Sequence, residues 1–141
     1  MLFLAVLLNV FINPGGSNRL FSKITDPCEQ IKSHVIAATL FTKDSIYRMA
    51  LAQIKNAFVV DQYEHCISFG KDAANNIIAS PVSNGSATSG KVPAIANAFA
   101  DLHNHPNITP PDAGDFYGLA DINKNNRDHK TRFVVTVSGM V

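Results

Sequence analysis

The stretch of sequence that decides the fold lies at positions 100–106 and reads Ala100-Asp101-Leu102-His103-Asn104-His105-Pro106. The apolar residues from Ile95 to Leu102 predict a central β-strand that runs directly into His103. Pro106 should end this strand, because proline has no N–H to donate to a neighbouring strand. The two histidines therefore stand at the end of a predicted strand.

A helix is predicted after the proline-rich spacer 107–111 and extends to about Lys124. Its expected cap is Asp112, whose short carboxylate can accept from the first free N–H groups of a helix. Asp115 follows three residues later, in the first turn. A carboxylate at that place should face back toward the strand end that carries the histidines.

This arrangement has the composition of a metal site. Side chains at i and i+2 of a strand share a face, so His103 and His105 can converge on one divalent ion. Asp115 would supply a third ligand and leave the fourth tetrahedral position open for water, which is typical of catalytic zinc. The simpler interpretation is a surface histidine pair beside two aspartates, Asp112 and Asp115, that only cap the helix.

The rest of the chain predicts an α+β domain around a small sheet. Two helices are expected before residue 63, one after Thr25-Asp26-Pro27 and one from Asp44 to about Ala57, each with an apolar stripe that packs on the core. Their stripes comprise Ile31, Val35, Ala38 and Phe41, and Ile46, Met49, Ala50 and Ile54. Short strands are predicted near 66–69, 77–79 and 132–138, and a mobile loop over 81–93, so the order is α-α-β-β-β-α-β.

The ends of the chain carry further expectations. Residues 2–12 are apolar except for Asn9, and as a helix would reach about 16 Å, against a bilayer core of about 30 Å. We divide the chain into an apolar segment 1–24, which is a signal-like or upstream segment or a buried strand or helix, and a domain 25–141. A further hairpin strand is expected after Gly139, so we expect the core to be truncated at its C-terminus. The compartment, cytoplasmic or exported, stays open.

Composition and charge bound the classes of function. The 141 residues are 46% hydrophobic and 16% charged, with a formal net charge of +1, which gives no basic footprint for nucleic acid or anionic lipid. The two cysteines form no CxxC pair that would indicate a thiolate zinc site. Of the remaining histidines, His34 and His129 are interpreted as surface or core residues without partners, and His65 as pointing away from its neighbour Glu64.

The segment His103-Asn104-His105-Pro106, its proline-rich spacer and Asp115 resemble the JAMM (JAB/MPN+) metalloproteases. The family pattern is an upstream Glu, then H-x-H-P, a spacer, and S-x-x-D opening a helix. The resemblance covers about residues 44–141 and implies a JAB/MPN-like (cytidine-deaminase-like) core in which zinc binds His103, His105 and Asp115. It also implies that Glu64, just before a predicted strand, is the general base; Glu29 is a weaker competitor.

The function that this resemblance implies is zinc-dependent hydrolysis of a peptide or isopeptide bond. The substrate would be a peptide or protein, including a ubiquitin-like or extended C-terminal tail, with loop 81–93 shaping the groove. Two features depart from the family: the spacer is one residue shorter than the commonest bacterial form, and Asp112 stands where the family has serine. Asp112 would then be a secondary partner of the oxyanion or an additional metal contact.

Two other functions compete with this one. A degenerate JAB/MPN domain could act as a non-catalytic protein-binding module, which Asp112 favours and the intact metal triad opposes. The motif Asp101-x-His103-x-His105 also resembles the opening of PHP-type phosphoesterases and amidohydrolases. Those enzymes place further ligands far downstream, and too little of this chain follows His105 to hold them.

Overall fold

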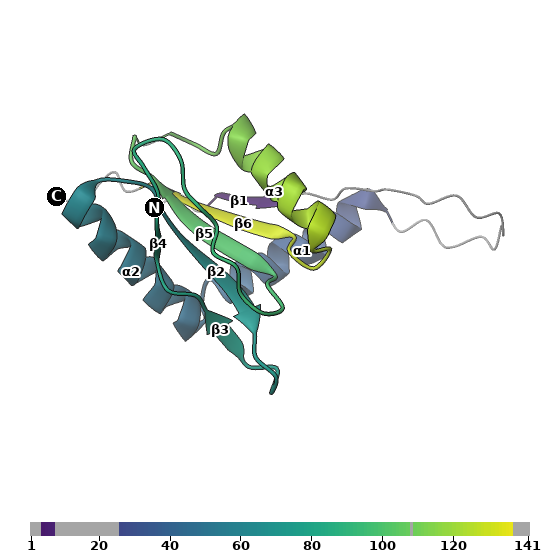
Figure 1. Ribbon diagram of the computed structural model, residues 1–141. Coiled ribbons are helices and arrows are strands. Elements are labelled where there is room, and N and C mark those ends of the chain that lie inside the picture. The colour runs from purple at the N-terminus through teal and green to yellow at the C-terminus, as the bar shows by residue number, and fades with distance from the viewer. Residues whose placement is uncertain (1–3, 8–25, 108, 137–141) are drawn as a thin grey trace.

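The structure is a computed structural model that describes residues 4–7, 26–107 and 109–136. It is an α+β fold in which a small mixed sheet lies between helices (Figure 1). The helices are α1 (Pro27–Phe41), α2 (Ser45–Asp61) and α3 (Ala113–Asn125). The strands are β1 (Leu4–Leu7), β2 (His65–Lys71), β3 (Ile77–Ala79), β4 (Ser83–Asn84), β5 (Ala100–His105) and β6 (Thr131–Thr136).

The sheet has the order β1-β6-β5-β2-β3, and β4 pairs with the beginning of β2. β5 and β6 are parallel, and the other pairs are antiparallel. A parallel pair needs a crossover connection, and here that connection is α3. The end of β5 and the start of α3 are therefore joined by a short loop on one side of the sheet, which is where the predicted metal ligands lie.

The sheet has one apolar face, which we call the core face. It carries the alternate side chains of the three central strands and packs against α1 and α2. Figure 1 shows these two helices on one side of the sheet and α3 on the other. The strand residues of the core face are Ile67, Phe69, Ala100, Leu102, Phe133 and Val135. The helices add Ala38, Tyr47, Ala50 and Ile54.

The opposite face, which we call the site face, is polar although it is buried. On β5 it carries Asp101, His103 and His105, and on β6 it carries Arg132. All four side chains are at most 8% exposed. A buried charged group needs a partner, so this face must be held by hydrogen bonds and ion pairs rather than by apolar packing.

Each described helix begins at an aspartate cap, as the sequence predicts. The carboxylates of Asp26, Asp44 and Asp112 accept from backbone N–H groups of the first turns. α2 runs to Asp61, four residues beyond the predicted end, and stops at Gln62, which has a left-handed backbone (φ 59°). The α+β class and the mixed sheet are confirmed, as are the helix after Asp112 and the strands near 66–69 and 77–79.

Several expectations about packing are wrong. Ile31 and Val35 are 47% and 45% exposed, so the only buried apolar side chain on α1 is Ala38 among those described. On α2 the predicted Ala50 and Ile54 are buried together with Tyr47, which the prediction did not include, whereas Met49 is 56% exposed. The contact line of α2 runs through Tyr47, whose ring packs against the sheet, and this leaves Met49 on the outward side of the helix.

Strand boundaries also differ from the prediction. The central strand starts at Ala100 and not at Ile95. The residues before it include Asn97, whose left-handed backbone (φ 47°) does not fit a regular strand. Loop 81–93 contains the two-residue strand β4. The apolar N-terminal run, for which strand and helix were both open, is a strand over residues 4–7 that pairs with β6.

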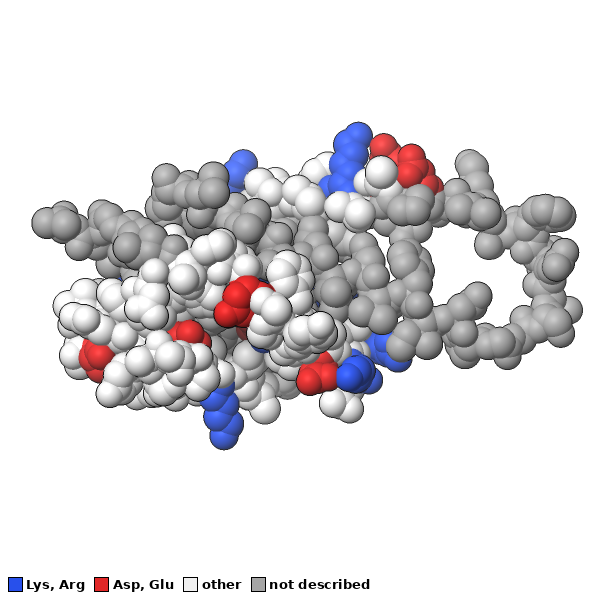
Figure 2. All heavy atoms as spheres, turned by 90° about the horizontal axis from the view of Figure 1, so that it is seen from above, with Lys and Arg blue, Asp and Glu red and all other residues white. Residues whose placement is uncertain are grey.

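Other expectations fall outside the described residues, namely those for 8–24 and for the chain beyond 136. Within the described ranges, no helix combines the length and the apolar character that a membrane crossing requires. On the face seen in Figure 2, the charged side chains that are drawn in colour are scattered and do not gather into a patch of one sign.

Candidate metal centre

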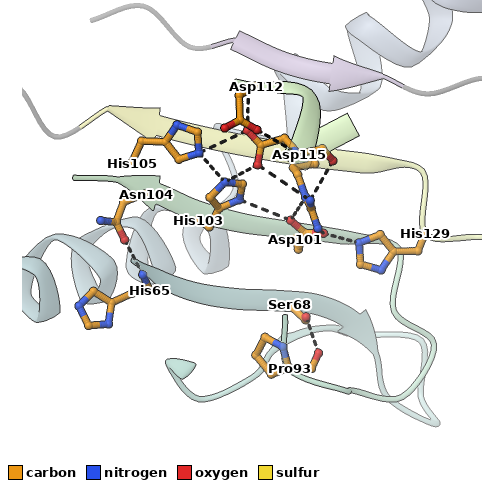
Figure 3. Close-up of polar contacts among 11 residues, drawn as sticks. His65, Ser68, Pro93, Asp101, His103, Asn104, His105, Asp112, Asp115 and His129 are labelled. Carbon is orange, nitrogen blue, oxygen red and sulfur yellow. Dashed lines mark hydrogen bonds and ion pairs between the residues drawn. The ribbon is translucent and has the colours of Figure 1, made fainter. Parts of the chain in front are cut away.

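The three predicted metal ligands meet at one point on the site face (Figure 3). Asp115 Oδ1 lies 2.8 Å from His103 Nε2, and Asp115 Oδ2 lies 3.3 Å from His105 Nε2. The two Nε2 atoms are 3.1 Å apart. β5 positions the histidines on one face by alternation, and the first turn of α3 brings the carboxylate over them.

These distances fit a tetrahedral metal ion. Ligand atoms about 2.0–2.1 Å from a tetrahedral ion lie about 3.3 Å from one another. The three measured separations range from 2.8 to 3.3 Å. All three side chains are buried, and the set of two imidazoles and one carboxylate is common for zinc but does not exclude other divalent ions. The group can therefore hold a metal ion, whose identity the geometry leaves open.

The outer nitrogen of each imidazole also faces an acceptor. His105 Nδ1 donates to the backbone carbonyl of Thr109 at 3.1 Å, and Thr109 Oγ1 is equally close. His103 Nδ1 lies 4.0 Å from Asp101 Oδ1. An acceptor at Nδ1 favours the tautomer with its lone pair on Nε2, which is the atom that faces the candidate metal position.

Asp101 is the centre of a buried network below the histidines. Arg132 Nε donates to Asp101 Oδ1 at 2.8 Å and Arg132 Nη2 to Oδ2 at 3.2 Å. His129 Nε2 donates to Asp101 Oδ2 at 2.8 Å, and Arg132 Nη1 reaches the backbone carbonyl of Asp115 at 2.9 Å. Arg132 thus joins the strand of the histidines to the helix of the third ligand.

The network explains two pKa shifts. Burial by itself would raise the pKa of Asp101, but the nearby His103 and the hydrogen bonds from His129 and Arg132 hold that pKa well below its usual range. Burial would likewise lower the pKa of His103, but its contacts with Asp101 and Asp115 raise it to about 9. In the metal-free protein a proton on His103 therefore competes with any metal ion.

Sequence reasoning missed this network. His129 was predicted to have no partner, which is wrong, since it is 1% exposed and paired with Asp101. The sequence separation between His129 and Asp101 is 28 residues, so no local pattern could have revealed the pair. The only signal in the sequence was a charged residue, Asp101, within a mostly apolar predicted strand.

Asp112 and Asp115 have the helix-capping role that the sequence allowed, and Asp115 also belongs to the candidate metal group. They form a capping box, in which Asp112 Oδ1 accepts from Asp115 N and Asp115 Oδ2 accepts from Asp112 N, at 3.2 and 2.9 Å. Asp115 nonetheless faces the histidines, and their hydrogen bonds hold its pKa well below its usual range although burial opposes this. Asp112 is exposed and lies on the wall of the adjoining cavity.

Beside the ligands lies a cavity of about 810 Å³. Glu64 lines it together with the three ligands, and so do residues 88–93 of the loop and the inward side of α3. Glu64 is partly buried, and this burial raises the pKa of its carboxyl. Glu29, the competing glutamate, is an exposed residue of α1 near Lys32 and is not part of the cavity wall.

Loop 81–93 forms one side of this cavity. Ser68 on β2 anchors it by donating to the carbonyl of Pro93 at 2.6 Å. Gly90 approaches so closely that an added Cβ would lie 2.4 Å from Cys66 Sγ and 3.3 Å from Glu64 Oε2. Cys66 is buried, and burial raises the pKa of its thiol to about 12. The His65 ring, by contrast, contacts Asp61 and Asn84 and takes no part in the cavity wall.

Comparison of the chain with protein-family models, with curated proteins and with solved structures finds no match in any of the three. The functional argument therefore rests on the motif and on the geometry of the site.

Proposed function

We propose that this protein is a JAMM-like zinc metallopeptidase or isopeptidase that hydrolyses an amide bond, with Glu64 as general base. One observation carries the proposal: the ligand atoms of His103, His105 and Asp115 converge within 4.8 Å of one another on the wall of the cavity that Glu64 also lines. A ligand set with an open side and an adjacent carboxylate is the arrangement that metal-assisted hydrolysis requires.

The fold supports the same proposal. The resemblance implies a JAB/MPN-like core with the H-x-H-P motif at a strand end, a helix that opens with the aspartate, and a glutamate before another strand. In this chain β5 ends at His105, α3 opens with Asp115 in its first turn, and Glu64 directly precedes β2. The three elements meet, since β2 pairs with β5 and Asp115 of α3 contacts both histidines of β5.

The chemistry divides between the ion and the side chains. A bound zinc ion lowers the pKa of water toward about 7 and polarises a substrate carbonyl. Glu64 would accept the proton of the attacking water and return it to the leaving amine. A carboxyl whose pKa burial has raised is well suited to the first of these steps, because its ionised form is a stronger base than an exposed glutamate.

Asp112 would act at the same cavity. Its Oδ1 is committed to the helix cap, so only the other carboxylate oxygen remains to face an oxyanion. A negative charge there opposes a developing oxyanion, which predicts slower turnover than a serine would allow. Asp112→Ser should therefore increase hydrolysis while keeping zinc, because serine also caps helices.

Metal content is the deciding measurement. We expect about one zinc per chain by elemental analysis of the purified protein, and loss of that zinc in the double variant His103→Ala/Asp115→Ala. His34→Ala is the matched control, because His34 lies on α1 and outside the cavity wall. Folded wild-type protein that binds no zinc after incubation with the metal would contradict the proposal and favour the non-catalytic binding module.

Hydrolysis is tested separately from binding. Glu64→Gln should keep zinc and lose cleavage of any member of a peptide library that the wild-type protein cuts, because glutamine cannot accept the proton. Glu29→Gln should cleave at the wild-type rate. Retained cleavage by the Glu64→Gln variant would remove Glu64 as the base.

A further inference from the structure

Asn104 stands between the two candidate metal ligands on β5 and is fully buried. Successive side chains of a strand point to opposite faces, so its carboxamide lies on the other side of the strand from the two imidazoles. Figure 3 shows this side chain directed toward the backbone of His65. The residue therefore belongs to the metal-binding motif by sequence but contacts no ligand.

The Asn104 carboxamide binds the backbone on both sides of Glu64. Its Oδ1 accepts from the His65 N–H at 2.8 Å, and its Nδ2 donates to the Tyr63 carbonyl at 3.0 Å. The β2–β5 register runs from Phe69↔Ala100 to Cys66↔His103 and goes no further. At the next position the Asn104 side chain thus replaces the backbone ladder.

The other edge of this segment is held as well. Glu64 N donates to the Ser86 carbonyl, and the Glu64 carbonyl accepts from Gly85 N, both at 2.8 Å. The backbone of Glu64 is therefore bound to the loop on one side, and the residues that flank it are bound to Asn104 on the other. These four hydrogen bonds fix the backbone position of Glu64 and therefore the point from which its side chain extends.

We propose that Asn104 is a positioning residue that fixes Glu64 relative to the two histidine ligands. The inference rests on the proposed function, in which Glu64 is the general base. Because Asn104 is the strand neighbour of both His103 and His105, any movement of β5 carries the ligands and the Glu64 anchor together. The distance between base and metal position is thereby kept constant.

The side chain at this position must offer one acceptor and one donor at the same reach. A carboxamide does so, whereas a carboxylate has no donor and alanine has neither group. Loss of the side chain would leave the His65 N–H and the Tyr63 carbonyl unpaired in a buried place, and the segment would relax to find other partners.

The chain offers a direct readout, because it contains only two glutamates, Glu29 and Glu64. Protein labelled with [¹³C]glutamate gives two carboxyl signals, of which the exposed Glu29 serves as an internal control. The variants are Asn104→Ala, which removes both hydrogen bonds, and Asn104→Asp, which keeps the acceptor for His65 and loses the donor. Asn123→Ala is the matched control, since Asn123 is also buried and bonds backbone carbonyls, those of Arg127 and His129.

In wild-type protein we expect zinc to shift the Glu64 carboxyl signal and to leave the Glu29 signal unchanged. In Asn104→Ala the zinc-induced shift of Glu64 should fall by about half or more, because the field of the ion weakens with distance. The zinc dissociation constant should change by less than about tenfold. A change of about tenfold is what we would expect if a metal ligand had lost its own hydrogen-bond partner. The amide of His65 should exchange with solvent about tenfold faster or more.

Two outcomes overturn the inference. One is a Glu64 signal that responds to zinc as in wild type although His65 has lost its protection. The other is a loss of zinc affinity that parallels the change at Glu64, which would place the action of Asn104 on the ligands. If Asn104→Ala does not fold, the same measurements on Asn104→Asp, with a smaller change expected, decide the question.

Failure of the proposed function is distinguishable from failure of this inference. If wild-type protein binds no zinc, the proposed function falls, and the metal-free titration of the Glu64 signal still tests the anchor. A Glu64 midpoint that is raised in wild type and falls in Asn104→Ala supports the anchor, and an unchanged midpoint overturns it.

Discussion

The two faces of the same sheet are built in opposite ways. On the core face, β5 contributes Ala100 and Leu102, which pack against the rings of α2 and β2. On the site face the same strand contributes Asp101, His103 and His105, all buried and all paired. The side chains alternate residue by residue, so one six-residue strand serves apolar packing and candidate chemistry at once.

The core face is dominated by aromatic rings. Phe41 contacts Tyr47, Phe69, Phe99 and Phe133 with ring centroids 4.9–5.9 Å apart. Such packing provides most of the stability of a small domain, whereas a buried ionic network has to repay its own desolvation. Substitutions on the core face should therefore change the free energy of unfolding. Substitutions on the site face should change both the free energy of unfolding and the metal affinity.

The largest effect is expected on the core face. Phe69→Ala removes a fully buried ring and should lower the free energy of unfolding by about 3–5 kcal/mol in denaturant titrations. The zinc affinity of the fraction that remains folded should be unchanged. Val60→Ala, at a residue 84% exposed, is the control and should have little effect. A decrease in unfolding free energy below about 1 kcal/mol for Phe69→Ala would contradict the different roles that we infer for the core face and the site face.

Asp101→Asn tests the site face. Asparagine cannot pair with Arg132 as an anion, so we expect a loss of about 1.5–3 kcal/mol in unfolding free energy. Because Asp101 also faces His103, zinc affinity should fall about 10- to 100-fold, as measured by competition with a chelating dye. Asp121→Asn, an exposed ion pair with Lys124, should change neither quantity. Unchanged zinc affinity in Asp101→Asn would separate the network from the metal centre.

Gly90→Ala tests the loop over the cavity. The added Cβ would meet Cys66 Sγ at 2.4 Å, so the loop must move, at a cost of about 1–3 kcal/mol. The control is Gly114→Ala, whose Cβ meets Asp112 Oδ1 at 3.0 Å; this side-chain atom can give way by a few tenths of an ångström, so the effect should be smaller than that of Gly90→Ala. The midpoint temperature of thermal unfolding should therefore fall in Gly90→Ala and should change much less in Gly114→Ala.

The smallest effect should be a gain. Burial raises the pKa of Glu64, so its ionised form is less favourable in the folded state than in the unfolded state. The free energy of unfolding is therefore highest below the pKa that Glu64 has in the unfolded chain, where the carboxyl is protonated in both states. It decreases as the pH rises through the higher pKa that Glu64 has in the folded protein. Glu64→Gln should thus stabilise the metal-free protein at neutral pH by up to about 1 kcal/mol, with no gain in acid. Glu29→Gln is the control, and an equal stability of Glu64→Gln and wild type at all pH values would contradict the argument.

Much of the site was predictable because its signals are local. Strand alternation places His103 and His105 together, and the capping pattern around Asp112 places Asp115 in a first turn, so the structure brings all three ligands to one point. Glu64 could be predicted only from its position before a strand. Its presence in the same cavity follows from the pairing of β2 with β5, which no local pattern encodes.

The exposed apolar residues of α1 show the opposite case. Periodicity predicted that Ile31 and Val35 pack on the core, yet Ala38 does so. Helical spacing identifies which residues share a face, but the neighbouring elements decide which part of that face is covered.

The sequence alone indicated most of the helices and strands and the three candidate ligands, because caps, breaks and alternation act within a few residues. Only the tertiary structure decided what surrounds them: the Asp101 network with His129 and Arg132, the anchor from Asn104 to the Glu64 backbone, and the cavity under loop 81–93. The physical reason is that a buried polar group takes whichever partner the packing of the sheet brings within hydrogen-bonding distance, and that partner can lie anywhere in the chain.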